Sequence, residues 1–291
     1  MPDLVWILKR WLSPGQHRRT RHLVFLKLGG SLITEKTKPY TARLEQIDAL
    51  ARVLAQILTT MPDLALLIGH GSGSFGHQAA QEEGTRAGLS ANASAETQER
   101  YWRGFVEVAY QAARLHRLVI DALHRAGVPA ISFPPSAILH RTRSGKLQCS
   151  IAPVHLALEA GLVPVVYGDV LFDARQGGGI VSTEEVFEAL ALPLRPQRIL
   201  LAGLEDGVWA DFPHRTRLIS EIDAKGFEQL RSSLGGAEGI DVTGGMLAKV
   251  EGMLRLACRL PGMRIFIFSA ADPKRLEAAF RDQAPGTWIT C

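Results

Sequence analysis

Short apolar runs and longer stretches with helical spacing alternate along most of this 291-residue chain. The apolar runs, which predict buried strands, cover residues 23–28, 64–67, 128–133, 162–167, 198–202 and 264–268. Residues 41–58 and 96–126 instead repeat apolar side chains at intervals of three and four, which predicts two long helices. Strands that alternate with helices predict an α/β protein with a mainly parallel sheet.

Glycines follow several of the predicted strands. They fall in the blocks 27–31, 69–76, 168–169 and 244–245. The carboxyl ends of parallel strands lie at one edge of the sheet, where the ligands of such proteins bind. The four blocks are therefore expected to face one crevice.

The segment 68–77, Ile-Gly-His-Gly-Ser-Gly-Ser-Phe-Gly-His, lies between a predicted strand and a helix expected to start near residue 78. Glycines in such a turn let backbone N–H groups converge on an anion, and a helix N-terminus adds partial positive charge. His77 at the end of the segment is able to donate to a phosphate oxygen or to move a proton. The segment predicts a phosphate-binding loop; the alternative is a tight connection with no ligand.

Lys27 ends the first predicted strand and is followed by Leu-Gly-Gly-Ser. A lysine beside two glycines suits a charge placed against a second phosphate group. The spacing does not match a Walker P-loop. Lys36 and Lys38 follow in a polar loop, for which simple solvation is the alternative.

Composition narrows the class of protein. The chain is 46% hydrophobic and 21% charged, which is typical of a globular protein with one large two-lobed domain or two small ones. Its net charge of +4 is too small to indicate a nucleic-acid partner. No apolar run is long enough to span a membrane, and residues 1–21 are expected to form an appendage, either a surface helix or a tail.

The three cysteines, Cys149, Cys258 and Cys291, are far apart and lack metal-ligand spacing. We therefore expect no disulfide framework and no protein-built metal site, and a reducing cytoplasm is the simplest location.

The blocks Lys-Leu-Gly-Gly-Ser at 27–31, Thr-Glu-Lys at 34–36, His-Gly-Ser-Gly-Ser-Phe-Gly-His at 70–77, Tyr-Gly-Asp-Val at 167–170 and Asp-Val-Thr-Gly-Gly-Met at 241–246 occur in this order. In this arrangement the chain resembles the amino acid kinase family from about residue 23 to its end, and more closely the branch that phosphorylates isopentenyl phosphate. His77 is the discriminating residue, because it marks kinases whose acceptor is a monophosphate or phosphonate.

The resemblance implies an αβα three-layer sandwich over residues 22–291, with an acceptor lobe at about 22–180 and a nucleotide lobe at about 181–291. It implies ATP-dependent phosphorylation of isopentenyl phosphate to the diphosphate by a homodimer. Mg²⁺ would be held by the phosphates of ATP and would need no cage of protein ligands.

The resemblance also assigns residues. For catalysis it implies Lys27, Lys36, His77 and Asp169, with Lys36 stabilising the transition state and Asp169 orienting a lysine. The implied contacts to ATP and to the transferred phosphoryl group are Lys27, Gly29, Gly30, Ser31, Gly73, Glu184, Gly245 and Lys249. The implied acceptor contacts are Gly71, Ser72, Gly76, His77 and Gly168. Phe105 and Ala109, with Ile131 and Phe133, are expected to wall an apolar pocket for the prenyl tail; ordinary core packing is the alternative.

Two blocks depart from the family pattern. Residues 182–185 are Ser-Thr-Glu-Glu where the family has Ser-Gly-Asp-Asp, and residues 202–208 are also altered. Glu184 or Glu185 is expected to replace the family's acid. The alternatives are a kinase for another small phosphate or phosphonate of the fosfomycin type, a uridylate-kinase-like enzyme, and a non-catalytic nucleotide-binding member.

Overall fold

The computed structural model describes residues 22–82, 88–89, 93–234 and 241–291, with the side chains of 77–78, 80–82, 231–234 and 241–244 left out. The expectations for residues 1–21 lie outside this part of the chain.

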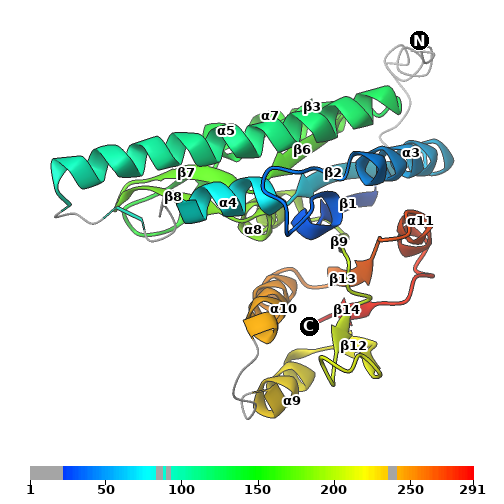
Figure 1. Cartoon of the computed structure of the whole chain (residues 1–291). Coiled ribbons are helices and arrows are strands. Elements are labelled where there is room, and N and C mark those ends of the chain that lie inside the picture. The colour runs from blue at the N-terminus through cyan, green and yellow to red at the C-terminus, as the bar shows by residue number, and fades with distance from the viewer. Residues whose placement is uncertain (1–21, 83–87, 90–92, 235–240) are drawn as a thin grey trace.

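One eight-stranded sheet runs through the molecule (Figure 1). Its order is β12-β14-β13-β9-β1-β2-β6-β3, and within it only β13 and β14 are paired antiparallel among the described strands. The strands are β1 (His22–Leu28), β2 (Leu64–His70), β3 (Ala130–Ser132), β6 (Val163–Tyr167), β9 (Arg198–Gly203), β12 (Glu221–Ile222), β13 (Arg264–Ser269) and β14 (Thr287–Ile289). The predicted mainly parallel sheet is confirmed.

Helices cover both faces of the sheet, because alternate side chains of each strand point to opposite faces. Val24, Leu26 and Leu28 of β1 pack into a core with α3 (Leu44–Thr60), α5 (Ala95–Arg125) and α11 (Lys274–Phe280). Phe25 packs into a second core on the other face. That face carries α7 (Ala152–Glu159), α8 (Thr183–Leu194), α9 (Ala224–Leu234) and α10 (Asp241–Arg259). The αβα sandwich is confirmed.

A four-stranded sheet, β5-β4-β7-β8, lies beside the main one. It contains β4 (Leu139–Arg141), β5 (Leu147–Cys149), β7 (Asp169–Asp173) and β8 (Gly177–Val181), and α6 (Pro135–Ile138) precedes it. The sequence predicted no strand at the three glycines of β8, which pair with β7. A Cβ at Gly178 would lie 2.8 Å from the ring of Phe105, so the missing side chain lets α5 pack closely against this strand. A separate pair joins β10 (Val208–Trp209) and β11 (Leu218–Ile219).

Two helices begin inside the glycine-rich segments. The one-turn helix α2 (Gly30–Ile33) follows β1, and α4 (Gly73–Glu82) starts five residues before the position expected from the sequence. Gly244 and Gly245 lie within the first turns of α10, so the prediction that they end a strand is wrong.

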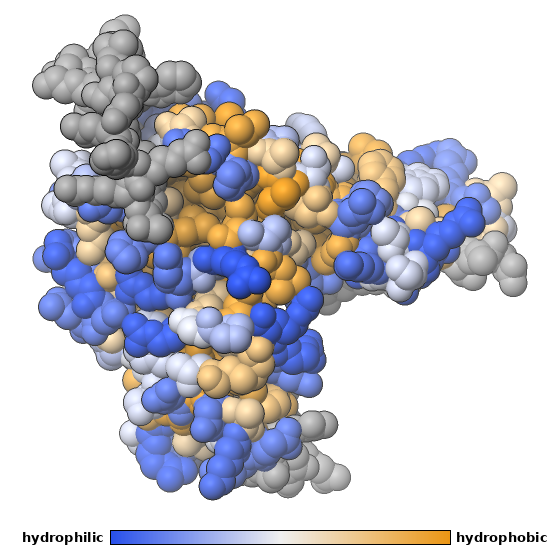
Figure 2. Space-filling view, turned by 180° about the vertical axis from the view of Figure 1, so that it is seen from behind, coloured by the Kyte–Doolittle hydropathy of each residue, from blue (hydrophilic) through white to orange (hydrophobic). Residues whose placement is uncertain are grey.

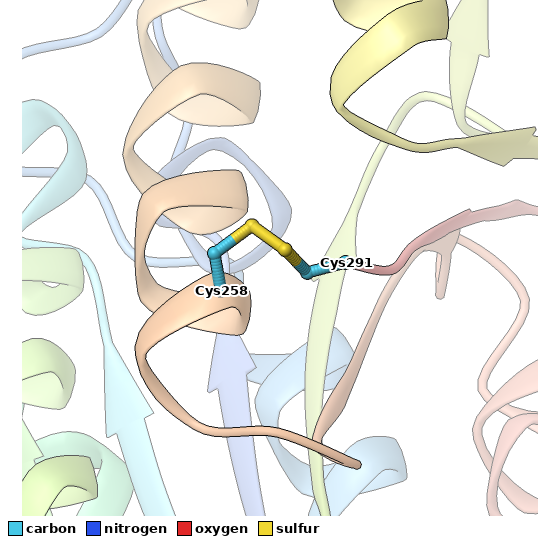
Figure 3. The surroundings of a disulfide bond; sticks show 2 residues. All are labelled: Cys258 and Cys291. Carbon is cyan, nitrogen blue, oxygen red and sulfur yellow. A yellow bond between two sulfur atoms is a disulfide. The ribbon is translucent and has the colours of Figure 1, made fainter.

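Cys258 of α10 forms a disulfide with Cys291, the last residue of the chain (Figure 3). Their Cα atoms are 5.0 Å apart, and Cys149 is free. The expectation that the cysteines stay unpaired is wrong for these two residues. Distance along the chain hid the pair, because β14 carries the C-terminus back toward α10 only in the folded molecule.

The division into lobes at about residue 180 stays a prediction, since a single sheet passes through both parts of the chain. Among the described residues, none of the helices combines the length and apolar character that crossing a membrane requires.

Candidate active site

Two glycine turns are in direct backbone contact at the carboxyl ends of β1 and β2. The N–H of Gly71 donates to the carbonyl of Leu28 at 3.0 Å. A Cβ at Gly30 would lie 2.7 Å from the backbone of Gly73, and one at Gly71 would lie 2.8 Å from the nitrogen of Gly30. Glycine is required here because the two loops approach closer than any side chain permits.

Thr34 joins the two turns. Its fully buried hydroxyl donates to the carbonyl of Gly30 at 2.8 Å and accepts from the N–H of Ser74 at 3.0 Å. Gly73 has φ +51°, and a Cβ there would lie 2.2 Å from Thr34 Oγ1. Sequence reasoning assigned Thr34 no role, because a single threonine after an apolar segment carries no signal of a contact 40 residues away.

The end of β6 completes the edge. The N–H of Gly168 donates to the carbonyl of His70 at 3.0 Å, and a Cβ at Gly168 would lie 3.7 Å from the nitrogen of Ser72. Ser72 in turn covers Gly76, where a Cβ would meet its Oγ at 2.3 Å. Three of the four predicted glycine blocks therefore meet at one edge of the sheet.

Two lysines, Lys27 and Lys249, lie close to one largely buried carboxylate beside these turns. Lys27 forms an ion pair with Glu184 of α8, and the two side chains are 12% and 21% exposed. Burial opposes ionisation of Glu184, but attraction from Lys27 and Lys249 lowers its pKa below the usual value. Burial, then repulsion from Lys27 and Lys36, lowers the pKa of Lys249, while Glu184 acts in the opposite direction. Three lysines against one carboxylate leave a surplus of positive charge that favours a polyphosphate.

Of the two acids that the sequence offered, Glu184 and Glu185, Glu184 is the one that pairs with Lys27. Asp169, expected to orient a lysine, is 2% exposed and its Oδ2 accepts from the N–H of Ser136 at 3.2 Å. Its Oδ1 has no partner among the described residues. Burial raises the pKa of Asp169, although the hydrogen bonds from Ser136 and Val170 oppose the shift. The lysine-orienting role of Asp169 stays a prediction.

The start of α8 shows how the altered block at 182–185 fits. Ser182 and Glu185 form a capping box, and Glu185 also pairs with Arg141. The hydroxyl of Thr183 is buried and donates to the carbonyl of His70 at 2.7 Å. Threonine fits in the family's glycine position because Gly69 makes room: a Cβ at Gly69 would lie 2.6 Å from Thr183 Cγ2.

An apolar cluster lies between α4, α5 and the strands β7 and β8. It contains Tyr101, Phe105, Val108, Ala79 and Val170, with Trp102, Ala109 and Ile180 partly buried against it. Phe105 and Ala109 are thus together, as expected. Ile131 and Phe133 are not part of this cluster: Ile131 is 38% exposed on β3, and Phe133 packs against the core on the other face. Their assignment to the same wall is wrong.

The remaining predicted residues differ in how well they are defined. Lys36 is exposed in the loop after α2 and repels Lys249. Ser31 is half-buried in α2, and Gly245 is exposed in α10. His77 lies in α4, but its side chain falls outside the described part of the chain. The prediction for His77 therefore stays open.

Glycine turns, the largely buried Lys27 and Lys249 and the edge of a parallel sheet together suit the binding of phosphate groups. The chain belongs to the amino acid kinase family, whose model matches residues 22–269. It is 35% identical over 272 residues to "Isopentenyl phosphate kinase" of Methanothermobacter thermautotrophicus, covering 92% of this chain and 99% of that one. It is also 35% identical to the protein of the same name from Haloferax volcanii, covering 92% and 98%.

Solved structures agree with this likeness. One described as "X-ray structures of isopentenyl phosphate kinase" superposes with a TM-score of 0.77 at 31% identity, over 92% of this chain and all of the other. A product complex of the Thermoplasma acidophilum enzyme superposes with a TM-score of 0.71 at 27% identity, over 92% and 99%.

Proposed function

We propose that this protein transfers the γ-phosphoryl group of ATP to isopentenyl phosphate and releases isopentenyl diphosphate and ADP. The observation that carries the proposal is the pair of Lys27 and Lys249 at Glu184, beside two interlocked glycine turns, with Lys36 close enough to repel Lys249. The relatives that the chain matches over nearly their whole length carry the name isopentenyl phosphate kinase, which supports this acceptor.

The transfer joins two highly charged groups and needs little covalent chemistry from the protein. Lys27 and Lys249 neutralise the phosphates of ATP, and Lys36 moves from its exposed loop to meet charge that develops in the transition state. Glu184 holds Lys27 in place. The backbone of Gly29, Gly30 and Ser31 contacts the transferred group, with Gly73 and Gly245 on the nucleotide side.

The acceptor phosphate lies against the second turn. Its contacts are Gly71, Ser72, Gly76, Gly168 and His77, where His77 donates to a phosphate oxygen. Asp169 offers its Oδ1, which has no partner among the described residues, to a lysine once both substrates are bound. The prenyl tail enters the apolar cluster around Phe105 and Ala109, which a compact phosphonate would leave unused.

Mg²⁺ accompanies ATP and supplies further charge neutralisation at the phosphates. Its ligands would be mainly the phosphates of ATP, because Mg²⁺ usually binds through substrate phosphates and water with few protein ligands. The proposal includes two lobes that meet near residue 180 and no nucleic-acid partner. The cytoplasmic location expected from unpaired cysteines loses that support, because Cys258 and Cys291 form a disulfide.

We also assign a homodimer that forms across the β3 edge of the main sheet. Ile131 of β3 and Leu156 of the neighbouring α7 are 38% and 62% exposed. Apolar surface gathers in the upper half of the rear face, the part of the molecule that carries these elements (Figures 1 and 2). An exposed strand edge next to apolar side chains favours pairing with a second copy.

A coupled ADP-release assay with MgATP tests the proposed reaction. The acceptors are isopentenyl phosphate, dimethylallyl phosphate, fosfomycin and UMP, each at equal concentration. We expect turnover with isopentenyl phosphate to exceed that with fosfomycin and UMP by orders of magnitude. Preference for fosfomycin or UMP, or ATP binding without turnover on any acceptor, would refute the proposal.

A further inference from the structure

Two histidines that the proposed reaction does not use form a buried chain behind the phosphate-binding turn. His70, the last residue of β2, is fully buried, and its Nδ1 lies 3.1 Å from the carbonyl oxygen of Gly71. Its Nε2 lies 3.0 Å from Nδ1 of His116 on α5, and His116 Nε2 lies 2.7 Å from the hydroxyl of Ser132. These hydrogen bonds thus connect the turn at Gly71 to Ser132 on the β3 edge of the sheet.

The carbonyl oxygen of Gly71, at one end of this series, fixes which group donates in each of its hydrogen bonds. A carbonyl oxygen only accepts, so Nδ1 of His70 carries the proton, and Nε2 of a neutral imidazole then accepts. His116 must therefore donate from Nδ1 to His70, and its own Nε2 accepts from Ser132. Both rings stack on Tyr167, with centroids 5.5 Å from His70 and 4.3 Å from His116.

Both histidines are neutral at neutral pH. Burial lowers the pKa of His70 to about 4, and Lys27 contributes in the same direction. Burial also lowers the pKa of His116 to about 2, with further repulsion from His70 and Arg117. The single set of donors and acceptors therefore persists under ordinary assay conditions.

The series of hydrogen bonds ends at the peptide between Gly71 and Ser72, and Ser72 is a predicted contact of the acceptor phosphate. The carbonyl of Gly71 and the N–H of Ser72 belong to the same planar peptide unit, so fixing one direction fixes the other. The other side of Gly71 is held by its N–H bond to Leu28. The nitrogen of Ser72 lies beside Gly168, at the sheet edge where we place the acceptor phosphate.

We propose that Ser132 and His116 act as a positioning relay: they fix the tautomer of His70, whose Nδ1–H holds the Gly71–Ser72 peptide so that its N–H is directed at the acceptor phosphate. Testing this relay by kinetics rests on the proposed function, whereas testing it by the NMR shifts of the histidines does not. Neither histidine touches the substrate or passes a proton to it.

His116→Asn and His116→Leu form a matched pair, because the two new side chains share one shape and only Asn donates from the position of Nδ1. We expect His116→Leu to raise KM for isopentenyl phosphate about three- to tenfold, the effect of losing one hydrogen bond, with KM for ATP unchanged. His116→Asn should restore a KM close to that of the unmodified protein. Equal losses in the two variants, or no loss in His116→Leu, would overturn the relay.

Ser132→Ala and Ser132→Thr repeat the comparison at the exposed end of the relay if substitution of buried His116 prevents folding. The alanine variant loses the donor to His116 Nε2 and the threonine variant keeps it. We expect a raised acceptor KM only for Ser132→Ala; the same KM in both variants would count against the relay.

The imidazole nitrogen shifts of the full-length chain, labelled with ¹⁵N-histidine, report the tautomers without any need for activity. We expect two histidines in the neutral Nδ1–H form at pH 7, one of which disappears in His116→Asn. An imidazolium or an Nε2–H form for either ring would overturn the relay even if the kinase assay succeeds. Conversely, the expected tautomers in a chain that shows no turnover would leave the relay standing and refute only the proposed reaction.

Discussion

At the scale of single residues, charge and missing side chains define the site. Glu184 is the group on which the arrangement of the two lysines depends, because its carboxylate pairs with Lys27 and attracts Lys249. Gly30, Gly71 and Gly73 matter because they lack a side chain, and a Cβ atom at any of them would push the two turns apart. Glu184 is one methylene longer than the aspartate of the family pattern and still pairs with Lys27. The hydrogen bond from Thr183 to His70 fixes the start of α8 beside β2.

Replacing Glu184 by Gln should lower kcat about tenfold to 100-fold, because Lys27 loses the charge that holds it beside the transferred group. Binding of ATP, measured by isothermal titration, should not weaken, since the site becomes more positive. Glu185→Gln is the control on the same helix: it disturbs the capping box and not Lys27. Equal losses of kcat in the two variants would contradict the role of Glu184.

The buried histidines predict a loss of stability in mild acid. The unfolded chain takes up protons near pH 6.5, whereas folded His70 does so only near pH 4 and His116 lower still. The free energy of unfolding should therefore be highest above pH 6.5 and fall as the pH decreases toward 5. Urea titrations at pH 7.5 and pH 5.0 measure this difference.

His116→Asn is the comparison that isolates the histidines from the carboxyl groups, which also titrate. It should reduce the loss of unfolding free energy between the two pH values, because one of the two buried rings is gone. A pH dependence as steep as that of the unmodified protein would show that the histidines are not its source.

At the scale of elements, α10 connects the site to the C-terminal strand. Lys249, near the middle of α10, interacts with Glu184 and Lys27, and Cys258 near its end is bonded to Cys291. The disulfide joins positions 33 residues apart, so it restricts the unfolded chain as well as the helix.

Cys291→Ser should lower the free energy of unfolding by about 2–4 kcal/mol under oxidising conditions, the usual effect of losing a disulfide. Cys149→Ser is the control, since Cys149 is free. Urea unfolding measures both variants, with and without a reducing agent. The prediction fails if reduction leaves the unmodified protein as stable as before.

At the scale of the whole molecule, the proposed homodimer rests on the exposed β3 edge and its apolar neighbours. Sedimentation velocity should give twice the 31.8 kDa mass of one chain. Ile131→Lys should shift the protein to the monomer, because a buried lysine at a strand edge disfavours pairing. Leu44→Lys, on the exposed start of α3, is the control and should leave the dimer intact. A monomeric unmodified protein would rule out this assembly.

Sequence patterns were enough to predict those features that depend on residues close together along the chain. The runs of Leu and Val in β1, β2, β6 and β9, and the spacing of α3 and α5, predicted the elements and the parallel sheet. Glycines after β1, β2 and β6 predicted that these strand ends meet at one edge, and phosphate binding there stays a prediction. The β4–β5 hairpin, the glycine strand β8 and the helices α7, α9 and α11 were not predicted. All but α9 are short and lack a clear period, whereas α9 repeats apolar residues at Phe227, Leu230 and Leu234, a helical spacing that was missed.

By itself, the sequence determined the fold class and the strand ends whose glycine turns meet, since periodicity and glycine turns are local properties of the chain. It also named Lys27, Lys36 and Lys249 in advance. Only the tertiary structure decided which groups meet: Glu184 with Lys27, Thr34 with Gly30 and Ser74, His70 with His116, and Cys258 with Cys291. It also separated Ile131 and Phe133 from Phe105, which sequence reasoning had placed in one pocket wall. The physical reason is that a hydrogen bond or an ion pair depends on distances between side chains from different elements, and these distances are set by how the elements pack.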